Sequence, residues 1–584
     1  MLSLENFYLE TKYYPPVPAS EFPSLFDPDG CYPYVQFCDT EQDGQLIQLN
    51  CVRLENDFLV AIVCPDLNGR LLSLVHKQSG KEALYRNDVV KPNRILPRWG
   101  WFSGGIEFNY PIAHSPTALE KVGYRTCITK GRVAVQCGET ERKYGLSWIV
   151  ELSLGENEDY LTQRSFFKNS GSVVRPWCFW TNAAVRSTPK THYLYPPAKV
   201  LRHADVCDYV QWPEIGEREK DFDRMTGLFW TAQGNGFGVW HPEEEIGLVH
   251  MSDPSTLRGM KFWTYGVGKH SHWPLLFCDE SGPYAEIQSG VAPDQATEMF
   301  LQPGEERQYI EFWSPVINEP DITQLQIPAP TGEFPPCKWL GHDHIPEVAE
   351  WDEVLAEVSA GTPAEKILVP RSPAPPLPEY LNALRTLYKQ NPDHWRSQYA
   401  TYLCGVMEFE KTYLHQTPDY SEVLQILDQC TSAAELRLKG LILARGCGNG
   451  KEAVSYLRQA HCLSKDVRLA IEYDMCLADA GPEFAQERSD LHAHYSTADR
   501  RWTERKVAFL LDNYKPAEAK NLLLSTKWDL YHLRQVRTTL YRKIQTALGL
   551  PVDPIPAQLG EDDMADWGAY RPGSTDGKKV LVND

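Results

Sequence analysis

The sequence lacks the features that carry a protein onto an anionic polymer or into a membrane. Its 584 residues hold 78 Asp and Glu against 58 Lys and Arg, a formal net charge of −20. Binding to nucleic acid or anionic lipid gains affinity from a basic surface, so we expect neither partner. No apolar run approaches the thickness of a bilayer, and the N-terminus has no basic stretch followed by an apolar core. We therefore expect a soluble protein of the cytoplasm.

Paired cysteines are lacking as well. Fifteen cysteines, an odd number, are scattered from Cys31 to Cys476 without the spacing of a disulfide framework or a zinc site. This distribution indicates reduced thiols inside a cytoplasmic protein. The nearest approach to a ligand cluster is His342-Asp343-His344, in a Pro-rich stretch that we interpret as a solvated loop. We expect no bound metal and no cofactor.

Short alternating stretches rich in β-branched and aromatic residues are abundant between about residues 35 and 315. Turn signals such as Asn68-Gly69 and Pro303-Gly304 separate them, and long helical patterns are nearly absent. So many strands in one block predict a large sandwich of stacked antiparallel sheets. The predicted strands cover residues 46–55, 58–65, 132–137, 146–154, 160–169, 236–242, 284–290 and 307–315.

From residue 379 to about residue 548 the apolar residues recur with a helical period. Similar helical stretches open at Glu422, Glu452, Glu483 and Glu518, which are 30, 31 and 35 residues apart. This period is typical of stacked helix hairpins and resembles tetratricopeptide repeats. The alternative is an ordinary helical bundle.

The chain thus divides into four predicted segments. Residues 1–325 form the β-sandwich domain, and 326–377 a Pro-rich connector that lies on it, with one short helix over 347–360. Residues 378–549 form the helical repeat domain. The tail, 550–584, is rich in Asp, Gly and Pro, and we expect it to lie along the surface or fold back on another domain.

The stretch 99–117, WGWFSGGIEFNYPIAHSPT, places one carboxylate, Glu107, among glycines and aromatic rings. A Gly pair lets backbone approach a ligand closely, and a poorly solvated acid is typical of catalysis. The alternative is a strand end whose Glu caps a turn. Candidates for binding substrate around Glu107 are Arg98, Trp101, Asn109 and His114.

A second carboxylate, Glu286, lies in the predicted strand 284–290. Strand alternation places Tyr284 and Gln288 on the same face, so the acid has hydrogen-bonding neighbours. The alternative is the polar outer face of an edge strand.

Two segments resemble the galactose mutarotase-like superfamily. LTQRSFFKNSGSVVRPWCFWTNAAV (161–185) is similar to its strand unit ending in Asn, which falls on Asn182, and YAEIQSGVAPDQ (284–295) is similar to its Leu-Glu-Thr-Gln segment. WFSGGIEFNYP matches the family's early His-Gly-Gly segment only loosely. The resemblance implies a β-supersandwich that binds carbohydrate, with Glu286 as a general base at the anomeric centre. The order of segments also resembles a bacterial family that has C-terminal tetratricopeptide-like repeats.

The sequence departs from this superfamily at one position. Its epimerases carry a histidine, the general acid, four residues before the asparagine, where this chain has Cys178. A buried thiol is a poor substitute for an imidazole. If the protein is an enzyme, another group must donate the proton, and Glu107 is our candidate.

The segment 261–274, KFWTYGVGKHSHWP, concentrates aromatic and imidazole side chains in a Gly-broken loop, a composition typical of sugar binding. From this segment we predict that Trp263, Tyr265, His270 and His272 bind substrate. Asn182 and Gln288 complete the predicted substrate-binding residues.

The leading hypothesis is a carbohydrate-active enzyme, a glycoside hydrolase that uses Glu107 and Glu286 as a catalytic pair. One alternative is an aldose epimerase in which Glu286 works with another acid, such as His114. A third hypothesis is a non-catalytic sugar-binding scaffold. The helical repeats would then bind a protein partner, or they could form a homodimer interface.

Overall fold

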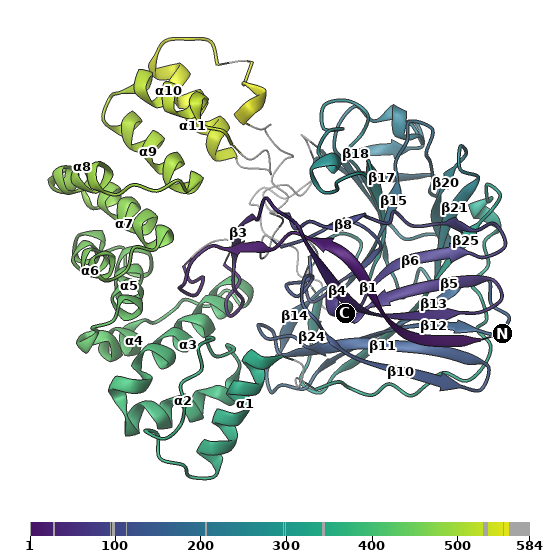
Figure 1. Ribbon diagram of the computed structural model, residues 1–584, viewed down its shortest axis with the longest axis horizontal. Coiled ribbons are helices and arrows are strands. Elements are labelled where there is room, and N and C mark those ends of the chain that lie inside the picture. Colours follow the sequence, from purple (N-terminus) through teal and green to yellow (C-terminus); the bar gives the residue numbers. More distant parts are fainter. Residues whose placement is uncertain are drawn as a thin grey trace. The chain divides into compact units, whose positions relative to one another are not determined.

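The computed structural model comprises two compact units, which are described separately (Figure 1). Of the described residues, the first contains those up to Val17 and Asp39–Ala349, and the second contains Pro18–Cys38 and those from Glu350 onward. The structure describes residues 2–26, 30–93, 95, 98, 100–112, 114–204, 207–295, 297, 299–341, 345–528, 535–552 and 554–559. The His342-Asp343-His344 cluster lies outside the described residues, and so does most of the predicted tail, 550–584.

The first unit is built on two large, mainly antiparallel sheets. The larger has the strand order β18-β17-β19-β22-β23-β15-β9-β6-β5-β4-β1-β8, with β7 paired to β6. In chain order its strands are β1 (Ser3–Tyr13), β4 (Gln45–Glu55), β5 (Leu59–Cys64), β6 (Arg70–His76), β7 (Lys81–Glu82), β8 (Val89–Val90), β9 (Ile106–Asn109), β15 (Trp180–Arg186), β17 (Ala198–His203), β18 (Cys207–Trp212), β19 (Thr226–Thr231), β22 (Gly259–Thr264) and β23 (Tyr284–Gly290).

The second sheet has the order β10-β11-β12-β13-β25-β21-β20-β16. Its strands are β10 (Gly123–Thr129), β11 (Arg132–Thr140), β12 (Leu146–Gly155), β13 (Leu161–Asn169), β16 (His192–Leu194), β20 (Gly236–His241), β21 (Ile246–Ser252) and β25 (Glu306–Val316). Two short pairs, β2 (Pro16–Pro18) with β3 (Phe37–Thr40) and β14 (Arg175–Trp177) with β24 (Met299–Leu301), complete the strands.

Large apolar side chains fill the interior of the β unit. Every residue of β12 is buried, and Trp148, Trp180, Trp230 and Trp313 are each at most 1% exposed. Sheets packed face to face need such volumes to fill the space between them. The predicted fold class, a mainly β supersandwich followed by an all-α repeat domain, is confirmed. The long first strand, β1, falls outside the predicted block of strands.

The first part of the connector, residues 331–335, lies along the second sheet, whereas Ala364, Ile367, Ala374 and Leu377 belong to a hydrophobic core of the helical unit. Arg132 Nε and Arg164 Nη2 donate to the carbonyl oxygens of Thr331 and Pro335 at 3.1 and 2.7 Å. Both guanidinium groups also stack on the ring of Phe334, at 4.2 and 4.1 Å from its centroid. Hydrogen bonds to backbone carbonyls and cation–π contacts therefore hold this Pro-rich segment on the β unit.

The second unit is helical. Acidic residues lie in the first turns of several helices, where their negative charge interacts favourably with the positive end of the helix dipole. Glu422 and Glu452 are examples. The helices are α1 (Pro346–Ser359), α2 (Pro378–Gln390), α3 (Pro392–Tyr413), α4 (Ser421–Ile426), α5 (Ala433–Leu441), α6 (Gly450–Leu463), α7 (Val467–Ala480), α8 (Ala485–His494), α9 (Arg500–Asp512), α10 (Pro516–Ser525) and α11 (Gln535–Ala547). No helix among the described residues is long and apolar enough to cross a membrane.

Residues 18–38 pack with these helices, whereas the sequence placed them in the β domain. Hydrogen bonds join the described part of this segment to α3, α5, α7 and α9, which are alternate helices of the repeat array. The donors and acceptors are Phe26 N to Glu408 Oε2 (2.9 Å), Arg437 Nη1 to Pro23 O (3.2 Å), Arg468 Nη1 to Gln36 Oε1 (2.7 Å) and Arg501 Nη1 to Ala19 O (2.8 Å). The segment therefore occupies one continuous face of the helical unit.

Candidate functional site

Four neighbouring strands of the larger sheet, β22, β23, β15 and β9, form the floor of the site. Residues paired directly across antiparallel strands point to the same face of a sheet. One row of such pairs runs Lys261, Gln288, Asn182, Glu107. The adjacent row on that face runs Trp263, Glu286, Ala184. The two predicted carboxylates therefore share a face, two strands apart, and Asn182 lies between them.

Glu107 is 3% exposed and has three polar neighbours. Trp101 Nε1 donates to Oε2 at 2.8 Å, and His114 Nδ1 lies 3.0 Å from the same oxygen. Arg70 Nη2 lies 3.7 Å from Oε1. Burial alone would raise the pKa of Glu107, but its interactions with His114 and Arg70 and the Trp101 hydrogen bond lower it to about 2. Glu107 is therefore a carboxylate at neutral pH.

Arg70 reaches Glu107 from β6. Its Nη1 donates to the carbonyl oxygens of Phe102 and Gly104 at 2.8 Å each, and its guanidinium lies 3.8 Å from the Phe102 ring centroid. The pair Gly104-Gly105 allows this segment to approach β6 closely. A Cβ on Gly105, whose φ is +68°, would lie 2.1 Å from the carbonyl oxygen of Leu71. The close backbone approach is therefore made to β6, not to a ligand as the sequence suggested.

Glu286 is also buried, and it has different neighbours. Asn182 Nδ2 and Gln288 Nε2 donate to its Oε2 at 3.1 and 3.0 Å. Burial raises the pKa of Glu286, and the Glu107 carboxylate adds to this rise. Lys261, His114 and the Asn182 hydrogen bond oppose it without cancelling it.

The directions of these two pKa shifts reverse the roles expected from the sequence. Glu107 was expected to be the protonated acid and Glu286 the ionised base. Instead the pKa of Glu107 is lowered by its interactions with His114 and Arg70, and the pKa of Glu286 is raised by burial. Two carboxylates on one face with their pKa values moved apart match the division of labour in acid–base catalysis.

Lys261 extends the polar network. Its Nζ donates to Gln295 Oε1 at 2.8 Å, and Gln295 Nε2 donates to Gln288 Oε1 at 3.1 Å. Burial lowers the pKa of Lys261 to about 8, although Glu286 and Glu107 both act to raise it. The ammonium is thus joined to Glu286 through two amide side chains.

Aromatic rings flank the network. Trp263 is half-buried, and its ring lies over Gly227, where a Cβ would come within 2.9 Å of the ring. The Tyr265 hydroxyl pairs with that of Tyr284 at 3.2 Å. A partly exposed indole beside a buried carboxyl is a suitable surface for a sugar ring.

Buried polar atoms without a hydrogen-bonding partner among the described residues also mark this face. They include Asn182 Oδ1, Arg70 Nη2 and both side-chain amide atoms of Asn109. Asn109 lies two residues from Glu107 on the same strand and therefore on the same face. Such groups are costly unless a ligand or water pairs with them.

Three predicted site residues have structural partners elsewhere. Arg98 donates to the carbonyl oxygen of Pro116 at 2.8 Å and forms an ion pair with Glu120. His270 Nδ1 accepts the backbone N–H of Met225 at 2.9 Å, so it braces a turn. His272 is exposed and contacts the Trp273 ring. Nothing in these contacts joins them to the two glutamates.

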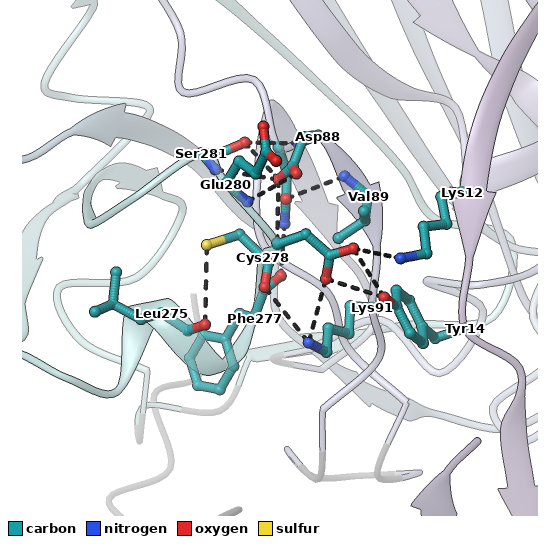
Figure 2. Close-up of polar contacts among 12 residues, drawn as sticks. Lys12, Tyr14, Asp88, Val89, Lys91, Leu275, Phe277, Cys278, Glu280 and Ser281 are labelled. Atoms are coloured by element: carbon teal, nitrogen blue, oxygen red, sulfur yellow. Dashed lines mark hydrogen bonds and ion pairs between the residues drawn. The ribbon is translucent and has the colours of Figure 1, made fainter. Parts of the chain in front are cut away.

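The loop between β22 and β23 is anchored to the edge of the same sheet (Figure 2). Asp88 accepts the backbone N–H of Glu280 at 2.8 Å, and Asp279 accepts Lys12 Nζ at 2.7 Å. From this loop the Phe277 ring meets Trp101 edge-on, with centroids 6.2 Å apart. Since Trp101 donates to Glu107, the anchored loop helps to fix that carboxylate.

Sequence reasoning missed Arg70, Lys261 and Gln295. Lys261 opens the segment that we identified from its aromatic residues, and Gln295 ends the segment similar to the mutarotase-like superfamily. Strand alternation was a signal that pointed to Lys261, because it lies two residues before Trp263 and therefore on the same face of the strand. For Arg70 the local sequence gives no signal, because its position depends on the pairing of β6 with β9.

The structure offers no metal site at these residues. In the part of the chain that the structure describes, no group of three or more His, Cys, Asp or Glu side chains is arranged to hold a metal ion. No disulfide joins any of the fifteen cysteines, all of which lie in the part of the chain that the structure describes.

Comparison with known proteins identifies relatives of both units. Residues 26–316 match a family model described as a domain of unknown function, DUF5107, and residues 378–544 match a model described as a C-terminal domain. The crystal structure of a TPR-domain containing protein from Parabacteroides distasonis is 34% identical, with a TM-score of 0.89. The match covers 97% of this chain and 99% of that one.

Two other solved structures match the β unit at lower similarity. A galactose mutarotase-like protein from Lactobacillus casei is 11% identical, with a TM-score of 0.35 over 45% of this chain and 99% of that chain. A putative aldose 1-epimerase from Klebsiella pneumoniae is 12% identical, with a TM-score of 0.37 over 54% of this chain and 92% of that chain.

Proposed function

This chain belongs to the family of the TPR-domain containing protein of Parabacteroides distasonis, and we propose that the β unit of this two-part architecture is a glycoside hydrolase. One observation carries the proposal. Two buried glutamates share a sheet face, and their surroundings move their pKa values in opposite directions. Hydrolysis of a glycosidic bond needs one protonated and one ionised carboxyl group. The half-buried Trp263 and the resemblance of residues 161–185 and 284–295 to a carbohydrate-active superfamily support a sugar as the substrate.

In the proposed reaction Glu286 is the general acid. Its proton passes to the glycosidic oxygen as the bond from that oxygen to the anomeric carbon breaks. Asn182 and Gln288 donate to Glu286 Oε2, so they orient the carboxyl group and stabilise the carboxylate that forms.

Glu107 is the general base. It accepts a proton from the water that attacks the anomeric carbon, while Trp101 and His114 hold its carboxylate in place. Two strand spacings and a two-residue offset put the Cα atoms of the glutamates about 12 Å apart. The Asn182 side chain fills the space between them. Because a whole strand that carries Asn182 lies between the two glutamates, we propose the wider carboxyl separation of inverting enzymes over the narrow one of retaining enzymes.

The variants E107Q and E286Q test the proposal. Each keeps the shape of the side chain and removes its acid–base function, so we expect hydrolysis to fall by about 10²–10⁴-fold. The assay is release of reducing ends and of aryl alcohol from a panel of oligosaccharides and aryl glycosides. E139Q is a matched control, since Glu139 is a buried glutamate of the second sheet whose pKa burial raises to about 8. Full turnover in either site variant would sink the assignment.

An aldose epimerase is the second candidate, favoured by the position of Glu286 in the segment similar to the superfamily's catalytic strand. His114, which is 22% exposed, would be the second proton-transferring group. Anomer exchange followed by NMR separates the two reactions, because exchange creates no new reducing end. Sugar binding with neither reaction would favour a non-catalytic scaffold.

For the helical unit we propose a role within the chain. The face formed by α3, α5, α7 and α9 is occupied by residues 18–38 of the same chain. A separate protein partner or a second copy would have to use another surface or displace this segment.

A further inference from the structure

Lys261 is a buried cation for which the chain supplies no carboxylate partner. Lys261 is 6% exposed, and its Nζ donates to the neutral amide oxygen of Gln295 at 2.8 Å. The ammonium lies 4.9 Å from the Trp263 ring centroid and 5.1 Å from that of Phe229. Among the described residues no Asp or Glu oxygen forms an ion pair with it.

Several other buried cations of this protein are paired directly with a carboxylate. Arg132 forms an ion pair with Glu158, Arg437 Nη2 lies 2.7 Å from Glu472, and Arg488 Nε lies 2.7 Å from Asp474. Burying a charge without a counter-ion is costly, and folded proteins rarely tolerate it without a reason. The isolation of Lys261 is therefore a departure from the pattern of its own chain.

The two glutamates of the site do not fill the role of counter-ion. Glu107 already has Arg70 Nη2 at 3.7 Å and His114 Nδ1 at 3.0 Å. Burial and the Glu107 carboxylate raise the pKa of Glu286, and neither glutamate lies within ion-pair distance of Lys261 Nζ among the described residues. The contact nearest to a counter-ion that the chain gives this ammonium is therefore a neutral amide oxygen.

We infer that the substrate is a glycoside of a uronic acid and that Lys261 binds the carboxylate of its sugar ring. The inference rests on the proposed function, because it takes this face as the sugar site. Lys261 pairs across strands with Gln288, and Glu286 is the diagonal neighbour on β23. Such neighbours lie about 7–8 Å apart at Cβ. One pyranose ring can span that gap, with its carboxylate at Lys261, its anomeric carbon at Glu286 and its face on Trp263.

Equilibrium binding of free monosaccharides to the full chain tests the inference without requiring turnover. The probes are glucuronate, galacturonate and mannuronate, each compared with its neutral hexose by calorimetry. We expect at least one uronate to bind at least about tenfold more tightly than its hexose, and a tenfold difference in affinity corresponds to about 1.4 kcal/mol. In K261Q this preference should fall to about onefold. In K261R it should remain.

The matched control is K199Q. Lys199 lies on β17 of the same sheet, exposed, with its Nζ 5.1 Å from the Tyr209 ring. Its replacement should leave the uronate preference intact. Absence of any uronate preference, or a preference that survives K261Q, overturns the inference. Stronger binding of a hexose 6-phosphate than of every uronate also overturns it, because the anion would then be a phosphate. Circular dichroism of K261Q and K261R shows whether the fold is retained.

Hydrolysis of aryl uronides and neutral aryl glycosides is measured separately. If no glycoside is hydrolysed but K261Q abolishes the uronate preference, the hydrolase proposal fails and the uronate site stands. If neutral glycosides alone are hydrolysed, the hydrolase proposal stands and the uronate inference fails.

Discussion

Replacing Lys261 by Met should stabilise the β unit at neutral pH. Burial lowers the pKa of this lysine to about 8 from the 10.5 of a free side chain. Below pH 8 the ammonium is protonated in both the folded and the unfolded states, and the folded state then carries the full cost of burying it. One pKa unit corresponds to 1.36 kcal/mol, so the cost is about 3 kcal/mol. Methionine matches the length of lysine and avoids this cost.

The pH dependence has a definite sign. Between pH 8 and pH 10.5 the unfolded state binds more protons at this residue than the folded state, so wild-type stability contributed by this group rises with pH. The advantage of K261M should therefore be largest, up to about 3 kcal/mol, at pH 7, and should shrink as pH rises through 8 toward 10.5.

Urea unfolding of the full chain, followed by tryptophan fluorescence at pH 7 and pH 9.5, measures this effect. K199M is the matched control, because Lys199 is exposed and its loss should change stability little at either pH. A K261M variant that is less stable than wild type at pH 7, or whose stability difference is the same at both pH values, refutes the reasoning.

Three further predictions follow from the site and from the helical unit. Hydrolysis should invert the anomeric configuration, since Asn182 separates the glutamates; NMR of the first-formed product checks this, and retention contradicts it. Activity should fall as pH rises through the raised pKa of Glu286, and should show no acid limb above about pH 4, because Glu107 has a pKa of about 2; a pH–rate profile with an acid limb near pH 5 contradicts these assignments. G405A should destabilise the helical unit by about 1–3 kcal/mol in urea unfolding, because a Cβ there would lie 2.1 Å from the Tyr32 ring. G450A, where a Cβ would have ordinary contacts at 3.6 Å, is its control, and equal stability of the two variants would show that segment 18–38 does not press on α3.

Local sequence pattern was enough to identify most of the floor of the site. Alternation in residues 284–290 placed Glu286 and Gln288 on one face, and the same face carries Asn182 and Glu107 in the structure. These predictions depend on neighbours two residues apart, which a sequence shows directly. The helical stretches were predicted for the same reason, since Glu422 and Glu452 lie in the first turns of α4 and α6.

Long-range pairing was beyond the local pattern. The lowered pKa of Glu107 comes first from His114, seven residues later, and then from Arg70, which β6 supplies from 37 residues earlier in the chain. The aromatic setting of Glu107 suggested a protonated acid, and the Arg70 contribution, which depends on strand pairing, is the part that the local sequence could not show. The contacts of residues 18–38 with the helices are also long-range, since Phe26 and Glu408, which share a hydrogen bond, are more than 380 residues apart in the chain.

Cys178 and Lys261 border the same apolar cluster. Cys178 belongs to an apolar cluster with Trp180, Leu201 and Phe229, and the Lys261 ammonium lies 5.1 Å from the Phe229 ring. An imidazole at residue 178 would put a second titratable group into the apolar wall that borders this ammonium. With a thiol there, this wall adds no second titratable group, and in the proposed reaction the proton for the leaving group comes from Glu286. C178A should then keep hydrolysis within about threefold of wild type, whereas a loss as large as that of E286Q would assign the proton donor to the thiol.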